Sequence, residues 1–402
     1  MSIRELFMLD AQVAYLNHGS YGACPRPVFE RYQAWQNELE REPVDLFARR
    51  LPGLLAEARA ALAAYVGADP DDLVFVLNAT RAVNVVARSL ELRSGDEVLA
   101  IDLEYGACDL VWEHTCARAG ASYVRAPIPL PLQRSAQVVD AVCERLSERT
   151  RALFVSHVTS DTALVLPVDE LVRRARDAGV VTIVDGAHGP GQLPLDLRRL
   201  GADVYAGNCH QWLCAPKGSG LLHVRRGLQD AIEALVIGYG DGSAFVVRHE
   251  DQSTRDPAAY LSIPTPIDWV QKNGAGARCR ALTIEAQRRL TEVERVQALR
   301  TPDFLAEMVA VQLPTNDAEA LELRLRNDHA IEIPVSGRET EPLLRVSIAP
   351  YNDESDLDRL LQALPPLRAP SPGSFNPRGR ARSRGRHGRS GRRRRGRGLR
   401  RT

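Results

Sequence analysis

Lysine is almost missing from this chain of 402 residues: of its 52 basic residues, only Lys217 and Lys272 are lysines. A reaction that needs a lysine amine must therefore use one of these two or none. The sequence also lacks an apolar run of the roughly 18–20 residues that a membrane helix needs. Its start, "MSIRELFMLD", has no apolar segment of the kind that secretory signals contain. These absences argue against a membrane protein and against a secreted one.

Cysteine is present, but without a pattern. The seven cysteines are odd in number and scattered, which argues against a disulfide framework and favours the reduced thiols of a cytoplasmic protein. Cys209, His210 and Cys214 lie close together in the sequence, yet their spacing matches no standard zinc site. We therefore expect small apolar packing there and no metal.

Acidic residues are missing from one end of the chain. Residues 368–402 contain 14 arginines and no acid, which leaves 38 basic residues against 51 acidic ones in 1–367, a net charge of −13. Because 377–402 has a single large apolar residue, we expect 367–402 to be a disordered Arg-rich tail. It is either a nucleic-acid-binding arm or a dispensable extension. The lack of aromatic residues in 377–402 for stacking on bases favours the extension, so nucleic acid is not an expected partner.

The pattern of the body indicates an α/β protein. From about residue 55 to 240, short β-branched runs alternate with helical patterns, which predicts a mostly parallel sheet covered by helices. Strands are expected at 72–77, 96–101, 152–158, 180–185, 203–208 and 220–224. Beyond residue 240 we expect a loop entering a helix at 260–270. Antiparallel strands at 311–314, 329–335 and 343–350 and a helix at 353–364 should follow. The predicted parts are an N-terminal segment (1–30), a large domain (31–255), a smaller α+β domain (256–366) and the tail.

Polar residues follow several of the predicted strands. In open α/β sheets, ligands bind at the carboxyl ends of the strands. Thr80 opens a helix, so it is either a cap or part of a phosphate cradle. Asp185 ends a buried strand, where a carboxylate is costly to desolvate without a cationic partner; a helix N-cap is the other interpretation. His188 either reaches the same ligand or is a polar turn residue.

Eight sequence blocks in a fixed order then carry a resemblance to a known family. The blocks are "YLNHGSYGACP", "NATRAVN", "EYGA", "SHVTSDTALVLPV", "VDGAHGPGQLPLDL", "GNCHQWLCAPKGSGLL", "STRDPAAYL" and "LRVSIAPYN". Together they resemble the class V aminotransferase-fold enzymes that use pyridoxal phosphate, and most of all the isopenicillin N epimerase-like group, which is related to cysteine desulfurases and lyases. The resemblance spans residues 12–362. It implies fold type I, with a seven-stranded, mostly parallel sheet in the large domain.

The resemblance also implies a role for individual residues. Asp185 would pair with the pyridine nitrogen, and Tyr105 would stack on the ring. Arg345 would hold the substrate carboxylate. The remaining implied contacts are with the ring oxygen (His188, Ser160), the phosphate (Ala79, Thr80, Asn208, His210), the phosphate in a partner subunit (Thr254) and the substrate pocket (Asn17, His18). A homodimer acting on a small amino-acid or peptide substrate follows. Core packing is the alternative for Tyr105, and a surface ion pair for Arg345.

One position departs from the family pattern. The residue after the histidine of "GNCH" would be the Schiff-base lysine, and here it is Gln211. An amide nitrogen does not attack an aldehyde, and the usual base at the α-carbon is lost as well. Three accounts stay open: non-covalent cofactor binding without turnover, altered chemistry with His188 or Tyr105 as base, or a single-base error in the sequence. Lys217, six residues on, is a less favoured substitute with a structural role as its alternative, and Lys272 is less favoured still.

The expected function follows from these points. We predict a pyridoxal-phosphate-dependent epimerase, lyase or aminotransferase that acts at the α-carbon of an amino acid or peptide. Its activity should be absent or strongly reduced because Gln211 replaces the lysine. Two alternatives belong to other classes: a non-catalytic regulatory or scaffold protein with the same fold, and a nucleic-acid-associated protein that uses the tail.

Overall fold

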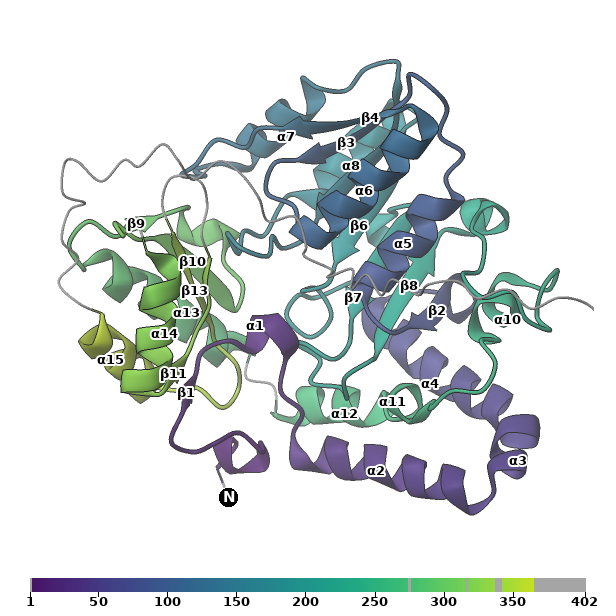
Figure 1. The fold of residues 1–402 in the computed structure, drawn as a ribbon, viewed down its shortest axis with the longest axis horizontal. Helices are drawn as coiled ribbons and strands as arrows, with labels where there is room; N and C mark the ends of the chain where they lie inside the picture. The colour runs from purple at the N-terminus through teal and green to yellow at the C-terminus, as the bar shows by residue number, and fades with distance from the viewer. Residues whose placement is uncertain (1, 274–275, 316, 337–341, 365–402) are drawn as a thin grey trace, which may run out of the picture. The chain divides into compact units, whose positions relative to one another are not determined.

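A computed structural model describes residues 2–273, 276–315, 317–336 and 342–364. Its largest sheet has seven strands in the order β2-β8-β7-β6-β5-β3-β4 (Figure 1). The strands are β2 (Leu73–Val76), β3 (Glu97–Ile101), β4 (Ser122–Ala126), β5 (Thr150–Ser156), β6 (Val181–Gly186), β7 (Val204–Asn208) and β8 (Gly220–Val224). All neighbours pair in parallel except β8, which is antiparallel to both β2 and β7. The predicted seven-stranded, mostly parallel sheet of fold type I is confirmed.

Both faces of this sheet are covered, as its nearly continuous apolar strands require. In β2, Leu73 and Phe75 belong to one core and Val74 and Val76 to another, which follows the two-residue period of a strand. The first core includes side chains of α4 (Leu51–Val66), α7 (Ser135–Cys143), α8 (Val168–Asp177) and the short α9 (Leu197–Leu200). The second includes side chains of α5 (Ala79–Ser89), α6 (Gly106–Ala119) and the short α10 (Phe245–Glu250).

Local sequence sets the start of the helix that matters most for the site. Asn78 has extended backbone angles, and its side-chain oxygen accepts a hydrogen bond from the backbone N–H of Arg81 at 2.8 Å. Asn78 is therefore the N-cap of α5, and Thr80 lies in the first turn. The first turn of α5 thus begins directly after β2, at the carboxyl end of that strand.

The smaller sheet has the order β12-β13-β10-β9, and its strands are antiparallel (Figure 1). Its strands are β9 (Gln297–Ala298), β10 (Met308–Gln312), β12 (Val335–Ser336) and β13 (Leu343–Ser347). Their apolar side chains form a core with those of α13 (Gly276–Thr291), α14 (Ala318–His329) and α15 (Glu354–Ala363). The predicted strand at 343–350 and helix at 353–364 correspond to β13 and α15.

The N-terminal segment contributes one strand to a separate two-stranded sheet. β1 (Ala14–Tyr15) pairs in parallel with β11 (Ile331–Glu332), and the short α1 (His18–Tyr21) follows. Next come α2 (Arg26–Arg41) and α3 (Pro43–Asp45). Since α1 begins shortly after the end of β1, its backbone is placed by a strand pairing with residues near the other end of the described chain.

A loop entering a helix was expected at 260–270, and α12 (Pro264–Asn273) is that helix; Pro264 occupies its first position, where the missing N–H costs nothing. The short α11 (Ala258–Leu261) precedes it. One prediction of local structure was wrong. The run expected as one antiparallel strand at 329–335 is divided into β11 and β12 around Ile333 and Pro334, and β11 pairs in parallel with β1.

The tail predicted as disordered, 367–402, lies outside the described residues. Within the described part of the chain, no helix is both long enough and apolar enough to cross a membrane.

Candidate active site

A cavity of about 420 Å³ lies at the carboxyl ends of the large sheet's strands. The strand registers align these ends, since Ser156 of β5 pairs with Asp185 of β6, and Asp185 with Ala206 of β7. Ten of the predicted site residues line this cavity: Ala79, Thr80, Tyr105, Ser160, Asp185, His188, Asn208, His210, Gln211 and Arg345. They come from several different strand ends and loops, so their convergence is a property of the tertiary structure.

Asp185 is a buried carboxylate without a cation. Its Oδ1 accepts from the backbone N–H of Ala187 at 2.9 Å, and the Cys108 thiol lies 3.5 Å from its Oδ2. Burial raises the pKa of Asp185, and these two hydrogen bonds only partly oppose that effect. No ion pair reaches this carboxylate from the residues that the structure describes. A protonated ring nitrogen would provide the missing charge, so the site fits the predicted cofactor here.

The first turn of α5 forms another wall of the cavity. Asn208, at the end of β7, accepts from the backbone N–H of Ala79 through its Oδ1 at 2.7 Å, which fixes the start of the helix against the strand. Thr80 follows on the same turn, where helix N–H groups and the helix dipole favour an anion. His210, also in the lining, donates from Nδ1 to the carbonyl of Ser219 at 2.9 Å. A phosphate at this end of the cavity therefore fits the residues present.

Gln211 is held at both ends of its side chain. Its Nε2 donates to the carbonyl oxygens of Gly19 at 2.8 Å and Ser20 at 3.2 Å, while its Oε1 accepts from Asn208 Nδ2 at 3.3 Å. The side chain is only 6% exposed. It therefore links β7 and the start of α5, through Asn208, to the backbone of α1.

His188 is fixed in one tautomer. The indole N–H of Trp212 donates to its Nδ1 at 3.1 Å, so the ring proton resides on Nε2. Burial, with the positive charge of Arg345 as a smaller cause, lowers the pKa of His188 to about 3. The imidazole is therefore neutral at physiological pH, and its Nε2 can donate a hydrogen bond but cannot accept a proton.

Tyr105 is, with Tyr21, one of the exposed aromatic residues that line the cavity. It is the N-cap residue of α6 and is 45% exposed, so the alternative of core packing does not hold. Burial of part of the ring and the neighbouring thiol of Cys108 raise the pKa of its hydroxyl. The phenol therefore stays protonated at neutral pH.

Arg345 carries a buried positive charge into the cavity from β13. Its two terminal nitrogens donate to the Ser160 carbonyl at 2.8 Å and to the Ser20 hydroxyl at 2.8 Å, and Nε has no partner among the described residues. Desolvation lowers its pKa. Within the same part of the chain it forms no ion pair, so the alternative of a surface ion pair does not hold. A buried guanidinium that is bonded only to neutral oxygens is suited to receive a carboxylate.

Four further residues lie outside the cavity lining. Asn17 stands behind Arg345, with its Oδ1 3.5 Å from a guanidinium nitrogen. His18 is fully buried and bonds to the Tyr351 hydroxyl at 3.0 Å and the Gln211 carbonyl at 3.1 Å, so it supports the loop from behind instead of bordering the substrate pocket. Thr254 is exposed and not part of the lining, and its expected role in a partner subunit stays a prediction. Lys217 lines a different hollow, beside Cys24 and Phe29.

Sequence reasoning assigned no role to three residues that shape this site. Ser20 contacts Arg345, and Trp212 fixes the His188 tautomer. The third, Glu104, is buried near the cavity, where its carboxylate accepts hydrogen bonds from the hydroxyl and the backbone N–H of Ser156. Ser20 and Trp212 belong to the same quoted blocks as His18 and Gln211, but no pattern in the sequence indicates their partners.

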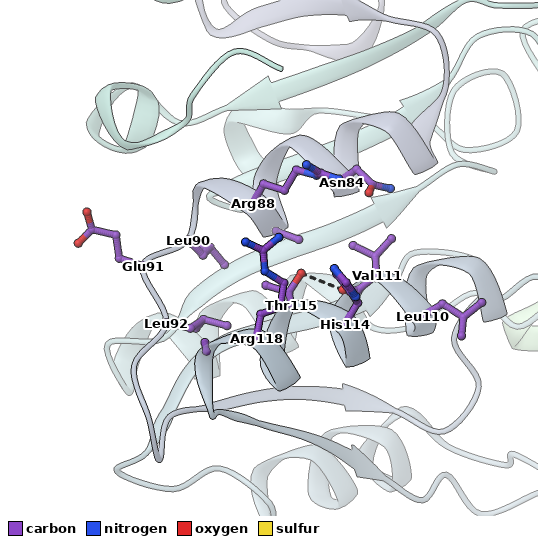
Figure 2. A pocket seen from close by; sticks show the side chains of 12 residues that line it. Asn84, Arg88, Leu90, Glu91, Leu92, Leu110, Val111, His114, Thr115 and Arg118 are labelled. Carbon is purple, nitrogen blue, oxygen red and sulfur yellow. Dashed lines mark hydrogen bonds between the residues drawn. The ribbon is translucent and has the colours of Figure 1, made fainter. Parts of the chain in front are cut away.

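A second hollow, of about 610 Å³, lies on the surface between α5 and α6. Figure 2 shows its lining, in which Leu90, Leu110 and Val111 lie near the charged or polar side chains of Arg88, Glu91, His114 and Arg118. None of the predicted site residues belongs to it. The chemistry is therefore expected in the smaller cavity at the strand ends.

The comparisons with known proteins agree with this geometry. The family model described as aminotransferase class-V matches residues 25–360. The isopenicillin N epimerase of Streptomyces clavuligerus is 38% identical over 387 residues, which are 90% of this chain and 97% of that protein. A probable chloroplastic L-cysteine desulfhydrase of Arabidopsis thaliana is 28% identical and covers 88% of this chain and 83% of its own.

Solved structures show the same fold at lower identity. A structure of the protein C-DES, a lysine-to-alanine mutant with glycine covalently linked to its PLP cofactor, has a TM-score of 0.80 at 23% identity, covering 90% of this chain and 98% of its own. Pyridoxal phosphate is the cofactor that the family match supports. From the length of the family match and the identity to the epimerase, this chain belongs to the class V aminotransferase family.

Proposed function

We propose that this chain is an isopenicillin N epimerase-like protein that holds pyridoxal phosphate without a covalent bond and has little or no turnover. The ancestral reaction would be epimerisation, elimination or transfer at the α-carbon of an amino acid or peptide-linked amino acid. The observation that carries the proposal is the state of Gln211: it occupies the position of the expected lysine, and both ends of its amide are hydrogen-bonded to the protein.

The cavity residues divide into those expected to hold the cofactor and those expected to hold the substrate. When bound, pyridoxal phosphate draws electrons from the substrate α-carbon. Asp185 would pair with the ring nitrogen, and His188 would donate from Nε2 to the ring oxygen beside Ser160. Tyr105 would cover one ring face. The phosphate would lie against Ala79, Thr80, Asn208 and His210.

None of the three residues considered as a base, Gln211, His188 and Tyr105, is able to take the α-proton. Gln211 has no basic nitrogen. His188 uses its Nδ1 lone pair on Trp212, and Tyr105 holds its proton at neutral pH. Since a positioned base contributes roughly 10²–10⁴-fold to such reactions, a large loss of rate is expected. This argument favours reduced activity over altered chemistry with His188 or Tyr105.

The substrate side of the proposal depends on Arg345. Its unpaired guanidinium would bind the substrate carboxylate, with Ser20 and Asn17 holding it in place. We also propose a cytoplasmic homodimer in which Thr254 contacts the phosphate of the partner subunit's cofactor.

The lysine-poor composition permits a direct test. Wild type and Gln211→Lys are incubated with pyridoxal phosphate, treated with borohydride, and mapped by peptide mass spectrometry. Wild type should bind the cofactor reversibly and acquire no fixed label, whereas Gln211→Lys should acquire a visible absorption band and a label at position 211. A Lys217→Arg variant serves as the matched control, because Lys217 and Lys272 are the two lysines of the chain.

Two outcomes would contradict the proposal. A label at Lys217 in wild type would mean that the attachment amine is supplied by that residue. Failure of Gln211→Lys to acquire any label would remove position 211 from the attachment site. Residual turnover on a panel of amino acids would favour an impaired enzyme, and its complete absence the non-catalytic regulatory or scaffold alternative; both are compatible with non-covalent cofactor binding.

A further inference from the structure

A third cavity lies behind the candidate active site. It has a volume of about 240 Å³, which is room for about eight water molecules at ~30 Å³ each. Its wall brings together residues from six regions of the chain: His18, Tyr65, Gln192, Trp212, Trp269 and Glu307. Pro194 and Gly276, the exposed members of the lining, mark where it opens to solvent.

Glu307 is the unusual member of this wall. The residue is only 7% exposed, and within the described part of the chain its carboxylate has no hydrogen bond and no ion pair. The backbone is well held, since the N–H of Glu307 donates to Gln192 Oε1 at 2.9 Å and its carbonyl accepts from Ile348 at 2.9 Å. The side chain is therefore a buried acid that faces a cavity and lacks a partner.

No cation forms an ion pair with Glu307 among the described residues. The guanidinium of Arg280, which is close enough to influence the carboxyl group, donates to the carbonyl of Leu305 at 3.1 Å instead. Tyr65, Cys214 and Cys279 are the other titratable groups near it, and all are neutral at pH 7 because burial raises their pKa values. His18, also in the wall, is neutral because burial lowers its pKa to about 3.

The rest of the lining is largely aromatic. Trp212, Trp269 and Tyr65 belong to the wall, and aromatic rings attract cations in sites from which water is excluded. A carboxylate beside two indoles and a phenol is the combination that recognises organic ammonium and guanidinium groups. A metal ion would need several oxygen ligands, and no group of three or more acidic, histidine or cysteine side chains able to hold one occurs among the described residues.

From this arrangement we propose that the cavity between Trp212, Trp269 and Glu307 binds a small organic cation, an alkylammonium or guanidinium group. Glu307 provides the charge and the aromatic rings provide the walls. This site is separate from the proposed cofactor pocket, and the inference does not depend on the proposed function. His18 and Trp212 form its wall on the side of the active site, where they contact the Gln211 carbonyl and His188.

Binding should depend on pH in one direction. Burial raises the pKa of Glu307 to about 8, so at pH 6 and 7 the carboxyl is mostly protonated and must lose its proton to pair with a cation. The affinity should therefore rise about tenfold from pH 6 to pH 7, about fivefold from pH 7 to pH 8, and level off above that.

The test uses the full chain, n-butylammonium as the probe, and tryptophan fluorescence together with titration calorimetry, because two of the four tryptophans line the cavity. Saturable binding at pH 8 that weakens about fivefold at pH 7 is expected, and n-butanol, the uncharged analogue, should bind at least tenfold more weakly. Glu307→Gln should lose the affinity at least tenfold, whereas the exposed Glu294→Gln should not change it.

Several results would overturn the proposal. They are the absence of saturable binding by wild type, equal binding of butanol, and unchanged affinity in Glu307→Gln. If Glu307→Gln does not fold, the pH dependence of n-butylammonium binding and its comparison with n-butanol, both on wild type, test the proposal. A purely apolar pocket would show neither effect.

Discussion

The amide nitrogen of Gln211 lies 2.8 Å from the carbonyl oxygen of Gly19, so a side chain of the large sheet's loop is bonded directly to the backbone of α1. At its other end the same side chain accepts from Asn208, which in turn holds the N–H of Ala79. A lysine could donate to the carbonyls but could not accept from Asn208. The glutamine therefore has a structural role of its own, with partners that its amide satisfies.

Removing this link should lower stability. We expect Gln211→Ala to reduce the free energy of unfolding by about 1–3 kcal/mol, because buried carbonyls and the Asn208 amide lose their partners. Gln211→Glu should cost more, since its carboxylate would face the carbonyls of Gly19 and Ser20. Urea denaturation measures both. The exposed Gln271→Ala is the control and should stay within about 0.5 kcal/mol of wild type. Equal stability of all four proteins would contradict the structural role.

The charge of Asp185 should govern cofactor affinity. Asp185→Asn keeps the shape and the bond from the Ala187 N–H, but removes the charge that a protonated ring nitrogen would need. A charge-assisted hydrogen bond contributes about 1.5–3 kcal/mol, so the affinity for pyridoxal phosphate should fall about 10–150-fold. Absorbance titration of the free cofactor measures this. Asp161→Asn, at an exposed position of the same lining, should have a much smaller effect, and the reverse order would count against the proposed ring orientation.

The binding of substrate carboxylates should depend on Arg345. We expect Arg345→Gln to weaken the binding of amino acids to the cofactor-loaded protein by about tenfold or more, because a charge-assisted hydrogen bond is lost. The corresponding amino-acid amides lack the carboxylate, and their affinity should be similar in wild type and variant. Calorimetry compares the two ligand series, and an equal loss for amides would mean that the variant had disturbed the pocket itself, since Arg345 also holds Ser20 and Ser160.

Glu307 should make stability depend on pH. Its pKa is raised to about 8 in the folded protein against about 4.5 in the unfolded chain. Between these values the unfolded chain has released the proton that the folded state retains, so this group's stabilising contribution is complete below pH 4.5 and is lost as the pH rises to 8. Relative to wild type, Glu307→Gln should therefore become progressively more stable from pH 5 to pH 8. Urea denaturation at the two pH values measures the difference. If the free energies of unfolding of wild type and variant differ by the same amount at pH 5 and pH 8, the carboxyl group is not desolvated.

Much of the large sheet was predictable because its signals are local. The strand ending at Asp185 is a run of apolar residues, and α5 begins at Asn78, whose side chain caps the helix. The position of β8 as the antiparallel strand was not predictable, because strand direction depends on the path of the loop between Asn208 and Gly220. The antiparallel strand predicted at 329–335 was wrong, because Ile331 and Glu332 pair in parallel with β1.

By itself the sequence determined which chemical groups exist: two lysines, a carboxylate at a strand end, an arginine in a late strand, and a glutamine where the family pattern has its amine. Only the tertiary structure decided where they point and what they contact. It placed His18 behind the cavity, put Lys217 in another hollow, fixed the proton of His188 on Nε2, and left Glu307 without a partner among the described residues. Such relationships join residues far apart in the chain or depend on burial. A side chain's partners and its pKa are set by its neighbours in space, and the order of residues along the chain does not specify them.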